Sequence, residues 1–207
     1  MISFPLSYEH FVCEPFSSLE HRTALFRFEA LEIVDTDGKS YIPKGLQKSI
    51  NEDVAEMDNE SLLKTYLIYG MNNDGRKELA SVFSLRCSSM NFQNPSANDS
   101  FNEILPAIEL VYLAVDKRYR QKHPESKGLG AITFDAFVVP VVKEISSLAG
   151  AKHLFLFAID NKTLVSHYIK TMDFEELPKD LEKSVVNNLV TEYTEQCKFL
   201  YQAIDIM

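Results

Sequence analysis

Apolar residues form two kinds of pattern in the middle of the chain. The segments 62–70 and 79–90 are rich in β-branched and aromatic residues, and Asn73-Asp74-Gly75 between them is a strong hairpin signal. After the polar stretch 91–100, residues 107–115 ("AIELVYLAV") are almost continuously apolar. The pattern therefore predicts an antiparallel pair followed by a central strand that is buried on both faces.

A longer apolar segment follows a paired glycine. Residues 128–150 ("GLGAITFDAFVVPVVKEISSLAG") are apolar nearly all round, which predicts a buried helix. Pro140 should kink this helix, because proline lacks an N–H and its ring clashes with the preceding turn. Gly150 should end it, as glycine often does.

The rest of the second half alternates strand and helix. Segment 152–160 predicts a buried strand, 161–172 a helix with Asp160 or Asn161 as its N-cap, and 197–204 a final strand. Antiparallel strands thus come first and a β-α-β-α order comes later. This order predicts an α+β fold.

The amino-terminal part is less regular. Segment 17–34 has a Ser cap and helical spacing, although its second half also alternates as a strand would; helix is the preferred interpretation. Segment 51–64 is acidic and predicts a helix or loop on the surface. This segment is either an ordinary solvent-exposed surface or the rim of a substrate site, where its acidic residues would attract a cationic substrate. The sequence contains no internal repeat.

Composition narrows the class of protein. The chain has 207 residues, 45% of them hydrophobic, which fits one domain over residues 1–207. A net charge of −9 argues against nucleic acid and membrane partners and suits a cationic substrate. The sequence shows neither an apolar membrane span nor a signal peptide, so we expect a cytoplasmic protein.

Cysteine and histidine spacing gives no sign of a structural bridge or a metal. Cys13, Cys87 and Cys197 are far apart and include no CxxC, which predicts reduced thiols. The histidines lack metal-ligand spacing, so no metal site is expected. The candidate chemistry lies instead in "KGLGA" at 127–131. A Gly-x-Gly at a helix start exposes backbone N–H groups that can bind phosphate, although many such loops are plain turns.

The run 107–174 resembles the GNAT superfamily of N-acetyltransferases. The resemblance rests on "IELVYLAVDKRYR", "KGLGA", the buried helix, "HLFLFAID" and "NKTLVSHYIKTMDF", in that order. It implies an α+β fold with α/β/α layers, whose mixed, mostly antiparallel sheet has a central splayed strand pair and flanking helices. It also implies transfer of an acetyl group from acetyl-CoA to a primary amine of a small molecule or peptide. The amine would attack the thioester directly in a ternary complex.

The phosphate loop departs from the superfamily pattern. Members usually show Arg or Gln in Arg/Gln-x-x-Gly-x-Gly/Ala, and here Glu125 stands at that position. We interpret 121–126 as an insertion and Arg120 as the displaced basic residue. The loop would still offer the N–H groups of Lys127 to Ala131 to the pyrophosphate.

The resemblance also assigns the rest of the cofactor site. The strand ending in Val115 would pair with the pantetheine arm, and the N–H of Leu113 would donate to the thioester oxygen. The cofactor-binding residues implied are Leu113, Ala114, Val115, Arg120, Lys127, Gly128, Leu129, Gly130, Ala131 and Asn161.

Two residues are candidates for proton transfer. Glu109 occupies the place where the histone-modifying branch of the superfamily has a glutamate, and burial would make it a better base near neutrality. The alternative is an exposed carboxylate that pairs with a nearby cation. Tyr168 follows Asn161 by seven residues, as the superfamily's acid often does. After Tyr168 the chain is one residue longer than the pattern, with Asp173 in place of glycine, so a structural aromatic remains the alternative.

Two functional hypotheses remain open from the sequence. The first is an active acetyl-CoA-dependent N-acetyltransferase. The second is a catalytically silent CoA-binding or interaction domain on the same fold. The variable segments 17–59 and 91–106 would line the acceptor side. Members of the superfamily are often homodimers, and the sequence carries no interface signature.

Overall fold

The computed structural model describes residues 2–34, 38, 40–41, 43–72, 74–93, 102–179, 181–182, 185 and 197–204. The described elements, in chain order, are β1 (Leu6–Tyr8), β2 (Phe11–Pro15), α1 (Ser18–Phe26), β3 (Ile33–Val34), β4 (Ser40–Tyr41), α2 (Lys44–Glu52), α3 (Val54–Asn59), β5 (Lys64–Met71), β6 (Lys77–Gln93), β7 (Asn102–Val115), α4 (Lys117–Lys122), α5 (Leu129–Thr133), the π-helical turn η1 (Phe134–Val138), α6 (Val139–Ala149), β8 (His153–Ile159), α7 (Lys162–Thr171), β9 (Glu175–Glu176) and β10 (Cys197–Ala203).

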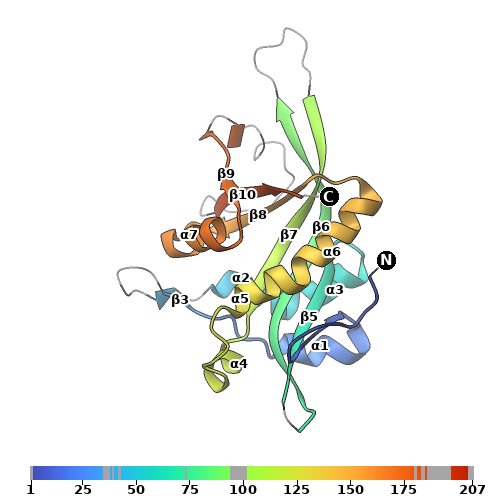
Figure 1. Cartoon of the computed structure of the whole chain (residues 1–207), viewed down its shortest axis with the longest axis vertical. Coiled ribbons are helices and arrows are strands. Elements are labelled where there is room, and N and C mark those ends of the chain that lie inside the picture. The colour runs from blue at the N-terminus through green and yellow to red at the C-terminus, as the bar shows by residue number, and fades with distance from the viewer. Residues whose placement is uncertain are drawn as a thin grey trace. The chain divides into compact units, whose positions relative to one another are not determined.

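The predicted α+β fold class is confirmed. Eight strands form one sheet in the order β1-β2-β5-β6-β7-β8-β10-β9, and β3 pairs with β4 separately (Figure 1). The described pairings are antiparallel except for β7 with β8, which is parallel. No helix in the described part of the chain is long and apolar enough to cross a membrane.

The chain packs as two compact units. Residues 1–86 and 110–141 form the first unit, and residues 87–109 and 142–207 form the second. The long strands β6 and β7 contribute residues to both units. The expectation of a single domain was made from composition, and each unit is described in turn below.

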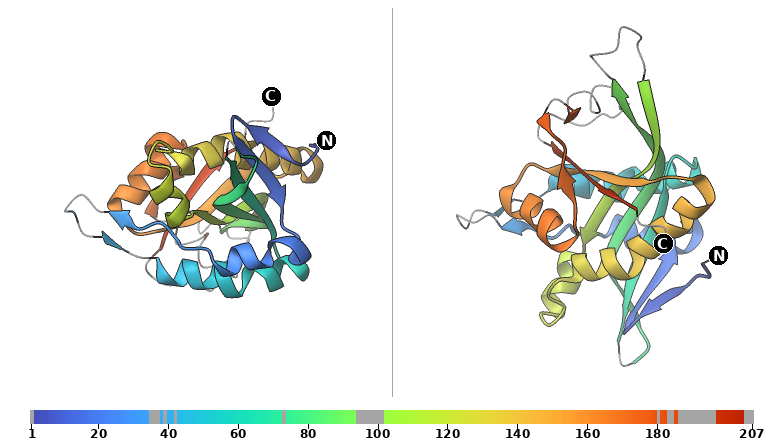
Figure 2. Two further views of the ribbon diagram at one scale, coloured as in Figure 1. Left: turned by 90° about the horizontal axis from the view of Figure 1, so that it is seen from below. Right: turned by 45° about the horizontal axis from the view of Figure 1, so that its top comes forward.

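The first unit has helices on both faces of its strands. Helices α1 to α3 lie on one face, and the helix that starts after Gly128 lies on the other (Figure 2). Side chains from α1, α2 and α3 and from β5, β6 and β7 share one apolar cluster, because each of these elements presents apolar residues to the others. The buried members of that cluster are Phe16, Leu25, Phe28, Ala30, Ile50, Val54, Leu67, Tyr69, Val82 and Ala114.

The predicted hairpin is confirmed and a further strand pair extends it. β5 and β6 pair antiparallel from Lys64↔Leu85 to Met71↔Lys77. Asn73 of the turn lies outside the described residues, and Gly75 adopts a φ of +78°, which glycine tolerates without strain. The sequence analysis missed β1 and β2, of which β2 pairs with β5.

Both interpretations of segment 17–34 hold, each for part of it. The helix α1 ends at Phe26. After it, Phe28 and Ala30 are buried while Arg27 and Glu29 are exposed, which is the alternation of an extended chain. The acidic segment 51–64 is only partly a surface: Val54 is fully buried, and buried Asp58 accepts the Thr65 N–H at 2.6 Å.

The predicted helix 128–150 is continuous but not uniformly α-helical. A π-helical turn, η1, ends two residues before Pro140, where the sequence predicted a kink. A proline cannot donate to the carbonyl four residues earlier, so a widened turn relieves both the clash and the missing bond. Gly150 ends the helix with a φ of +71°, as predicted.

The second unit is built on β8. This strand pairs in parallel with β7 over Ala107↔His153 to Glu109↔Phe155, and antiparallel with β10 over its whole length. Its aromatic residues pack against Phe199 of β10, with the Phe155 and Phe199 ring centroids 5.5 Å apart and the rings tilted. The buried members of its core cluster are Met90, Ala107, Phe155, Leu177, Val185 and Phe199.

Tyr119 of α4 packs directly on the backbone of Gly70 in β5, and this contact gives a stability prediction. A methyl group at Gly70 would lie 2.6 Å from two ring carbons of Tyr119. We expect Gly70→Ala to lower the free energy of unfolding by about 1–3 kcal/mol, because the buried ring has to shift. Thermal and urea denaturation measure the loss.

Gly45→Ala in helix α2 is the matched control. No atom lies within 4 Å of the methyl group it would add. Alanine also favours the helix, so this variant should be as stable as the wild type or more stable by up to about 1 kcal/mol. Wild-type stability in Gly70→Ala would show that the Tyr119 ring moves aside without cost.

Candidate active site

In the first unit, β7 ends at a buried carboxylate. Asp116 is fully buried, and its N–H donates to the Ala80 carbonyl of β6 at 2.8 Å. Its side chain caps α4 by accepting the N–H groups of Arg118 at 2.8 Å and Tyr119 at 3.3 Å. The Arg118 guanidinium also donates a hydrogen bond to the Asp116 carboxylate at 2.7 Å, and this bond raises the pKa of Arg118. These bonds stabilise the turn from strand to helix.

Arg120, predicted as the displaced phosphate ligand, lies on α4 and contacts the following loop. Its Nη1 donates to the carbonyls of His123 at 3.0 Å and Pro124 at 2.7 Å. These carbonyls come just after α4, where carbonyl groups lack partners within the helix. The guanidinium has five N–H donors, so this role leaves others for a ligand.

The predicted phosphate loop leads into a helix start. Gly128 is the N-cap of α5 with a φ of +80°, a backbone conformation that only glycine adopts easily. The Lys127 N–H already donates to the Glu125 carbonyl at 2.8 Å, so the N–H groups that the helix start presents are those from Gly128 to Ala131. A methyl group on Gly130 would lie 3.9 Å from Val115, which places the helix start beside the end of β7.

The edge of β7 near Leu113 and Val115 is the predicted pantetheine site. Since Asp116 bonds to β6, strand alternation turns the N–H and C=O groups of Leu113 and Val115 to the other edge. On that edge the Val115 carbonyl accepts the Leu31 N–H at 3.0 Å. The described register of β7 with β8 ends at Glu109. Ala114, between the two, is buried in the apolar cluster.

Glu109, in the second unit, is 0% exposed. It lies on β7 opposite Phe155 of β8 in the parallel register. The alternative of a solvent-exposed carboxylate is therefore wrong. Burying a charged carboxylate is costly unless it is hydrogen-bonded, so the Glu109 side chain needs hydrogen-bond partners inside the protein.

Tyr168 and Asn161 belong to one unbroken helix of the second unit. Asn161, not Asp160, is the N-cap of α7: its side-chain oxygen accepts the N–H groups of Thr163 at 3.0 Å and Leu164 at 3.1 Å. This leaves the two N–H donors of the Asn161 amide for a ligand. Tyr168 is 8% exposed, and burial raises the pKa of its phenol to about 12. The phenol therefore keeps its proton throughout the neutral range.

The residue added to the superfamily spacing lies after Tyr168. The Tyr168 carbonyl accepts the N–H groups of Met172 at 3.1 Å and Phe174 at 3.2 Å, and Asp173 adopts a φ of 55° between them. Asp173 thus takes a left-handed conformation, which aspartate tolerates better than most residues. The rotation of Tyr168 relative to Asn161 is unaffected by the added residue.

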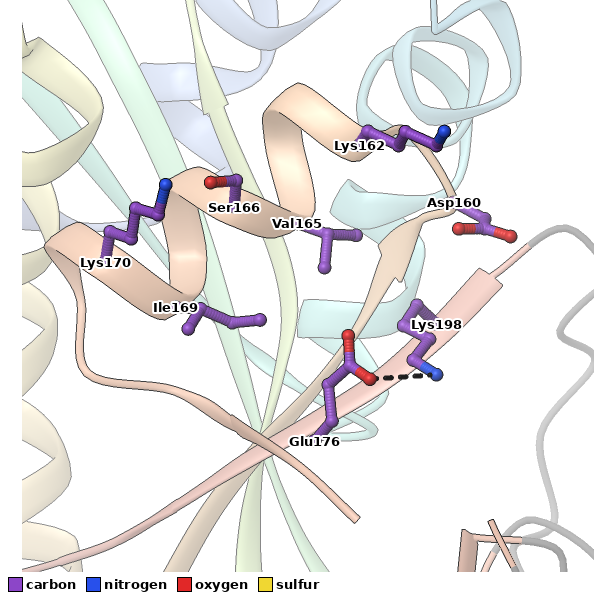
Figure 3. Close-up of a pocket in the computed structure, with 8 residues that line it drawn as sticks. All are labelled: Asp160, Lys162, Val165, Ser166, Ile169, Lys170, Glu176 and Lys198. Carbon is purple, nitrogen blue, oxygen red and sulfur yellow. Dashed lines mark ion pairs between the residues drawn. The ribbon is translucent and has the colours of Figure 1, made fainter. Parts of the chain in front are cut away.

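A shallow hollow lies along α7, with a volume of about 390 Å3. Val165 and Ile169 form its apolar part, while Lys162 and Lys170 extend from the same helix (Figure 3). Lys198 of β10 pairs with Glu176 there at 3.3 Å. Its mixed charges favour neither anions nor cations. None of the predicted site residues lines it.

Sequence reasoning missed Asp116, Tyr119 and His123, which shape the loop but touch no predicted ligand. Asp116 had a detectable signal, because an aspartate directly before "KRYR" is a typical N-cap. Within the described residues, no group of three or more His, Cys, Asp or Glu side chains could hold a metal ion.

Comparison with known proteins gives matches in structure but not in sequence. No family model and no curated protein matches the sequence. A crystal structure of AtaTR bound with acetyl-CoA has a TM-score of 0.64 and 17% identity, with 94% of each chain covered. A tyrosine-to-phenylalanine mutant of KacT has a TM-score of 0.61 and 16% identity, over 95% of this chain and 96% of that one.

A further neighbour is a complex. The structure of the AtaT–AtaR complex bound to DNA has a TM-score of 0.54 and 18% identity, with 93% of each chain covered. At identities this low the likeness concerns the fold. AtaT and KacT have the GNAT fold. The sequence-based resemblance is therefore confirmed at the level of fold: this chain has the mixed, mostly antiparallel sheet and flanking helices of the GNAT fold.

Proposed function

We propose that this protein is an acetyl-CoA-dependent N-acetyltransferase. The observation that carries the proposal is the helix start at Gly128, which lies beside the end of β7 at Val115. A helix start that can bind an anion thus lies next to a strand edge. The helix start suits the pyrophosphate of acetyl-CoA, and the strand edge suits its pantetheine amides. The same fold occurs in a neighbour that is bound with acetyl-CoA.

The pyrophosphate would bind the N–H groups from Gly128 to Ala131. The partial positive charge at the start of the helix favours an anion there. Lys127 is exposed beside these groups and would add a charge-assisted contact, as would the donors of Arg120 that the loop carbonyls leave unused. The amide of Asn161 is proposed as a further cofactor contact.

The pantetheine arm would pair with the edge of β7 that carries the N–H and C=O groups of Leu113. The Val115 carbonyl already has Leu31 as its donor, so the arm would use the groups between Glu109 and Val115. The N–H of Leu113 lies on this edge and is proposed to donate to the thioester oxygen. Such a donor stabilises the charge that develops on the oxygen when the amine attacks.

Glu109 is the proposed base for the incoming ammonium ion. An alkylamine has a pKa near ~10.4, so nearly all of it is protonated at neutral pH and cannot attack. Because Glu109 is fully buried, it would receive the proton through a water molecule rather than by direct contact. The nitrogen lone pair then forms the new amide bond as the C–S bond breaks.

Tyr168 is the proposed donor to the departing sulfur. A phenol with a pKa of about 12 holds its proton more tightly than a thiol with a pKa near ~8.5. Tyr168 would therefore stabilise the thiolate mainly by donating a hydrogen bond as charge develops on sulfur. Two of the structural neighbours were studied as tyrosine-to-phenylalanine mutants, which fits an important tyrosine in those proteins.

The acceptor is proposed to be a primary amine of a small molecule or peptide. The net charge of −9 favours a cationic acceptor. One neighbour, an AtaT mutant, is bound to the C-terminus of its antitoxin, so a GNAT fold of this form can bind a protein segment. A peptide acceptor or protein partner is therefore included beside polyamines and other small amines.

A silent CoA-binding domain is the second candidate, and Glu125 in the phosphate loop is the observation that favours it. Two measurements separate the candidates. Acetyl-CoA should raise the melting temperature, and a panel of amines and lysine peptides should then release free thiol. Stabilisation without thiol release by any amine in the panel would favour the silent domain.

Gly128→Val tests the phosphate loop. A branched side chain at a φ of +80° strains the helix start and blocks the approach of phosphate, so we expect most of the stabilisation by acetyl-CoA to disappear. Gly75→Val is the matched control, because Gly75 has a φ of +78° in the β5–β6 turn. That variant should lose comparable stability but keep the shift on adding acetyl-CoA. Full cofactor stabilisation of Gly128→Val would remove the loop from the cofactor site.

Tyr168→Phe tests the donor. We expect kcat to fall roughly ten- to a thousandfold with little change in acetyl-CoA affinity, because the change removes a donor and little volume. With a pKa of about 12, the phenol stays protonated up to about pH 10, so the ratio of wild-type to mutant kcat should stay constant from pH 6.5 to 9.5. Equal rates would show that Tyr168 is a structural aromatic.

Glu109→Gln tests the base through the pH profile. In the wild type, Glu109 can accept the ammonium proton, so the rate should depend only weakly on the fraction of amine that is already neutral. The glutamine cannot accept a proton, so the rate of the variant should follow the neutral fraction of the amine and rise steadily with pH. Melting temperature and acetyl-CoA affinity are measured alongside as controls for the fold. A wild-type profile in Glu109→Gln would point to another base.

A further inference from the structure

His123 holds the loop before Gly128 against β6 with both of its ring nitrogens. Its Nε2 lies 3.3 Å from Glu78 Oε2, and its Nδ1 lies 3.2 Å from Glu125 Oε1. The His123 side chain is 24% exposed and that of Glu78 is 30% exposed, whereas that of Glu125 is 70% exposed. The contact with Glu78 is thus the better shielded of the two.

Only a protonated imidazole can donate to both carboxylates. A neutral imidazole carries one N–H, so its other nitrogen would direct a lone pair at a carboxylate oxygen. The imidazolium has two N–H donors and a positive charge, and both match this arrangement. Protonation of His123 therefore strengthens two contacts at once, and deprotonation breaks at least one of them.

The loop that follows is ordered through His123. Its ring stacks on Tyr119 with centroids 4.3 Å apart, and its carbonyl accepts from Arg120 at 3.0 Å and from the Ser126 N–H at 3.0 Å. Ser126 is two residues before Gly128. An anchor at His123 thus limits the positions that the helix start can adopt, which saves ordering entropy when a ligand binds there.

We propose that His123 is a positioning residue for cofactor binding. As an imidazolium it bridges Glu78 and Glu125, fixes the loop 121–127, and thereby tightens acetyl-CoA binding at the helix start. The ligand in this inference rests on the proposed function. The loop anchor itself rests on the contacts of His123.

Other charged groups surround His123. Lys122 pairs with Glu78 at 3.1 Å, and this bond, with a smaller contribution from His123, lowers the pKa of Glu78. The pKa of Glu125 is lowered by its own backbone N–H first, then by His123 and His10. Arg120 contacts the loop through carbonyl groups. His10 is a second imidazole that acts on Glu125, so it needs a control of its own.

The experiment compares the wild type with His123→Gln between pH 5.5 and 8.0. Acetyl-CoA affinity is measured by calorimetry, and hydrogen exchange of the loop 121–128, corrected for intrinsic rates, is measured without ligand. We expect the wild type to gain about two- to fivefold in affinity over His123→Gln on going to pH 5.5. We also expect greater loop protection in the wild type at that pH. Titration of the cofactor's own phosphate cancels in the ratio.

Two matched variants sharpen the comparison. Lys122→Gln removes a contact to the same Glu78 but leaves the imidazole, so the pH dependence of loop protection should persist. His10→Gln removes the neighbouring histidine, and its pH dependence should also match the wild type. Glu78→Gln should reproduce His123→Gln, because it removes the better shielded partner.

The outcomes separate this inference from the proposed function. If His123→Gln shows the wild-type pH dependence of loop protection, the anchor is wrong, whatever the cofactor does. If loop protection follows His123 while acetyl-CoA affinity is unchanged by the variant at every pH, the link to cofactor binding is wrong. If acetyl-CoA does not bind the wild type at any pH, the proposed function fails, and with it the ligand named here.

Discussion

A carboxylate withdrawn from water must have its hydrogen bonds supplied by the protein, and Asp116 satisfies this constraint at the end of β7. Its side chain accepts from Arg118 and Tyr119, and its N–H bonds to β6. These bonds fix the direction in which the chain leaves the strand. The position of α4, the packing of Tyr119 on Gly70, and the path of the loop to Gly128 all follow from that exit.

The main elements could be predicted because their signals are local. The apolar runs at β7 and β8, the turn at Gly75 and the glycine ends of the long helix each follow from side-chain period or backbone freedom. The strands β1 and β2 were missed because they are short: β1 spans only Leu6–Tyr8 and has no buried residue. The division into two packed units also has no local signal, since β6 and β7 run through both without a break.

The sequence predicted the backbone positions of the candidate site, but it did not predict which groups its side chains contact. Gly128 and Asn161 occupy the helix starts that their spacing indicated, because a left-handed glycine and an N-cap are local devices. The partners of Arg120 and His123 could not be predicted, since they depend on how the loop 121–126 folds back on α4 and β6. The burial of Glu109 was one of two alternatives from the sequence, because the apolar run around it predicts a strand buried on both faces.

The turn after α7 explains how the chain can have one more residue than the superfamily pattern and still keep the orientation of Tyr168 relative to Asn161. An added residue before Tyr168 would rotate its side chain by about 100° around the helix. Asn161 and Tyr168 keep the seven-residue spacing within one helix, so the added residue falls after Tyr168, in the turn at Met172 and Asp173. The cost is a non-glycine residue in the left-handed region, of the order of 1 kcal/mol and least for Asp and Asn. If Tyr168 takes part in the reaction, this small loss of stability in the turn costs less than a phenol rotated away from the substrate would cost in rate.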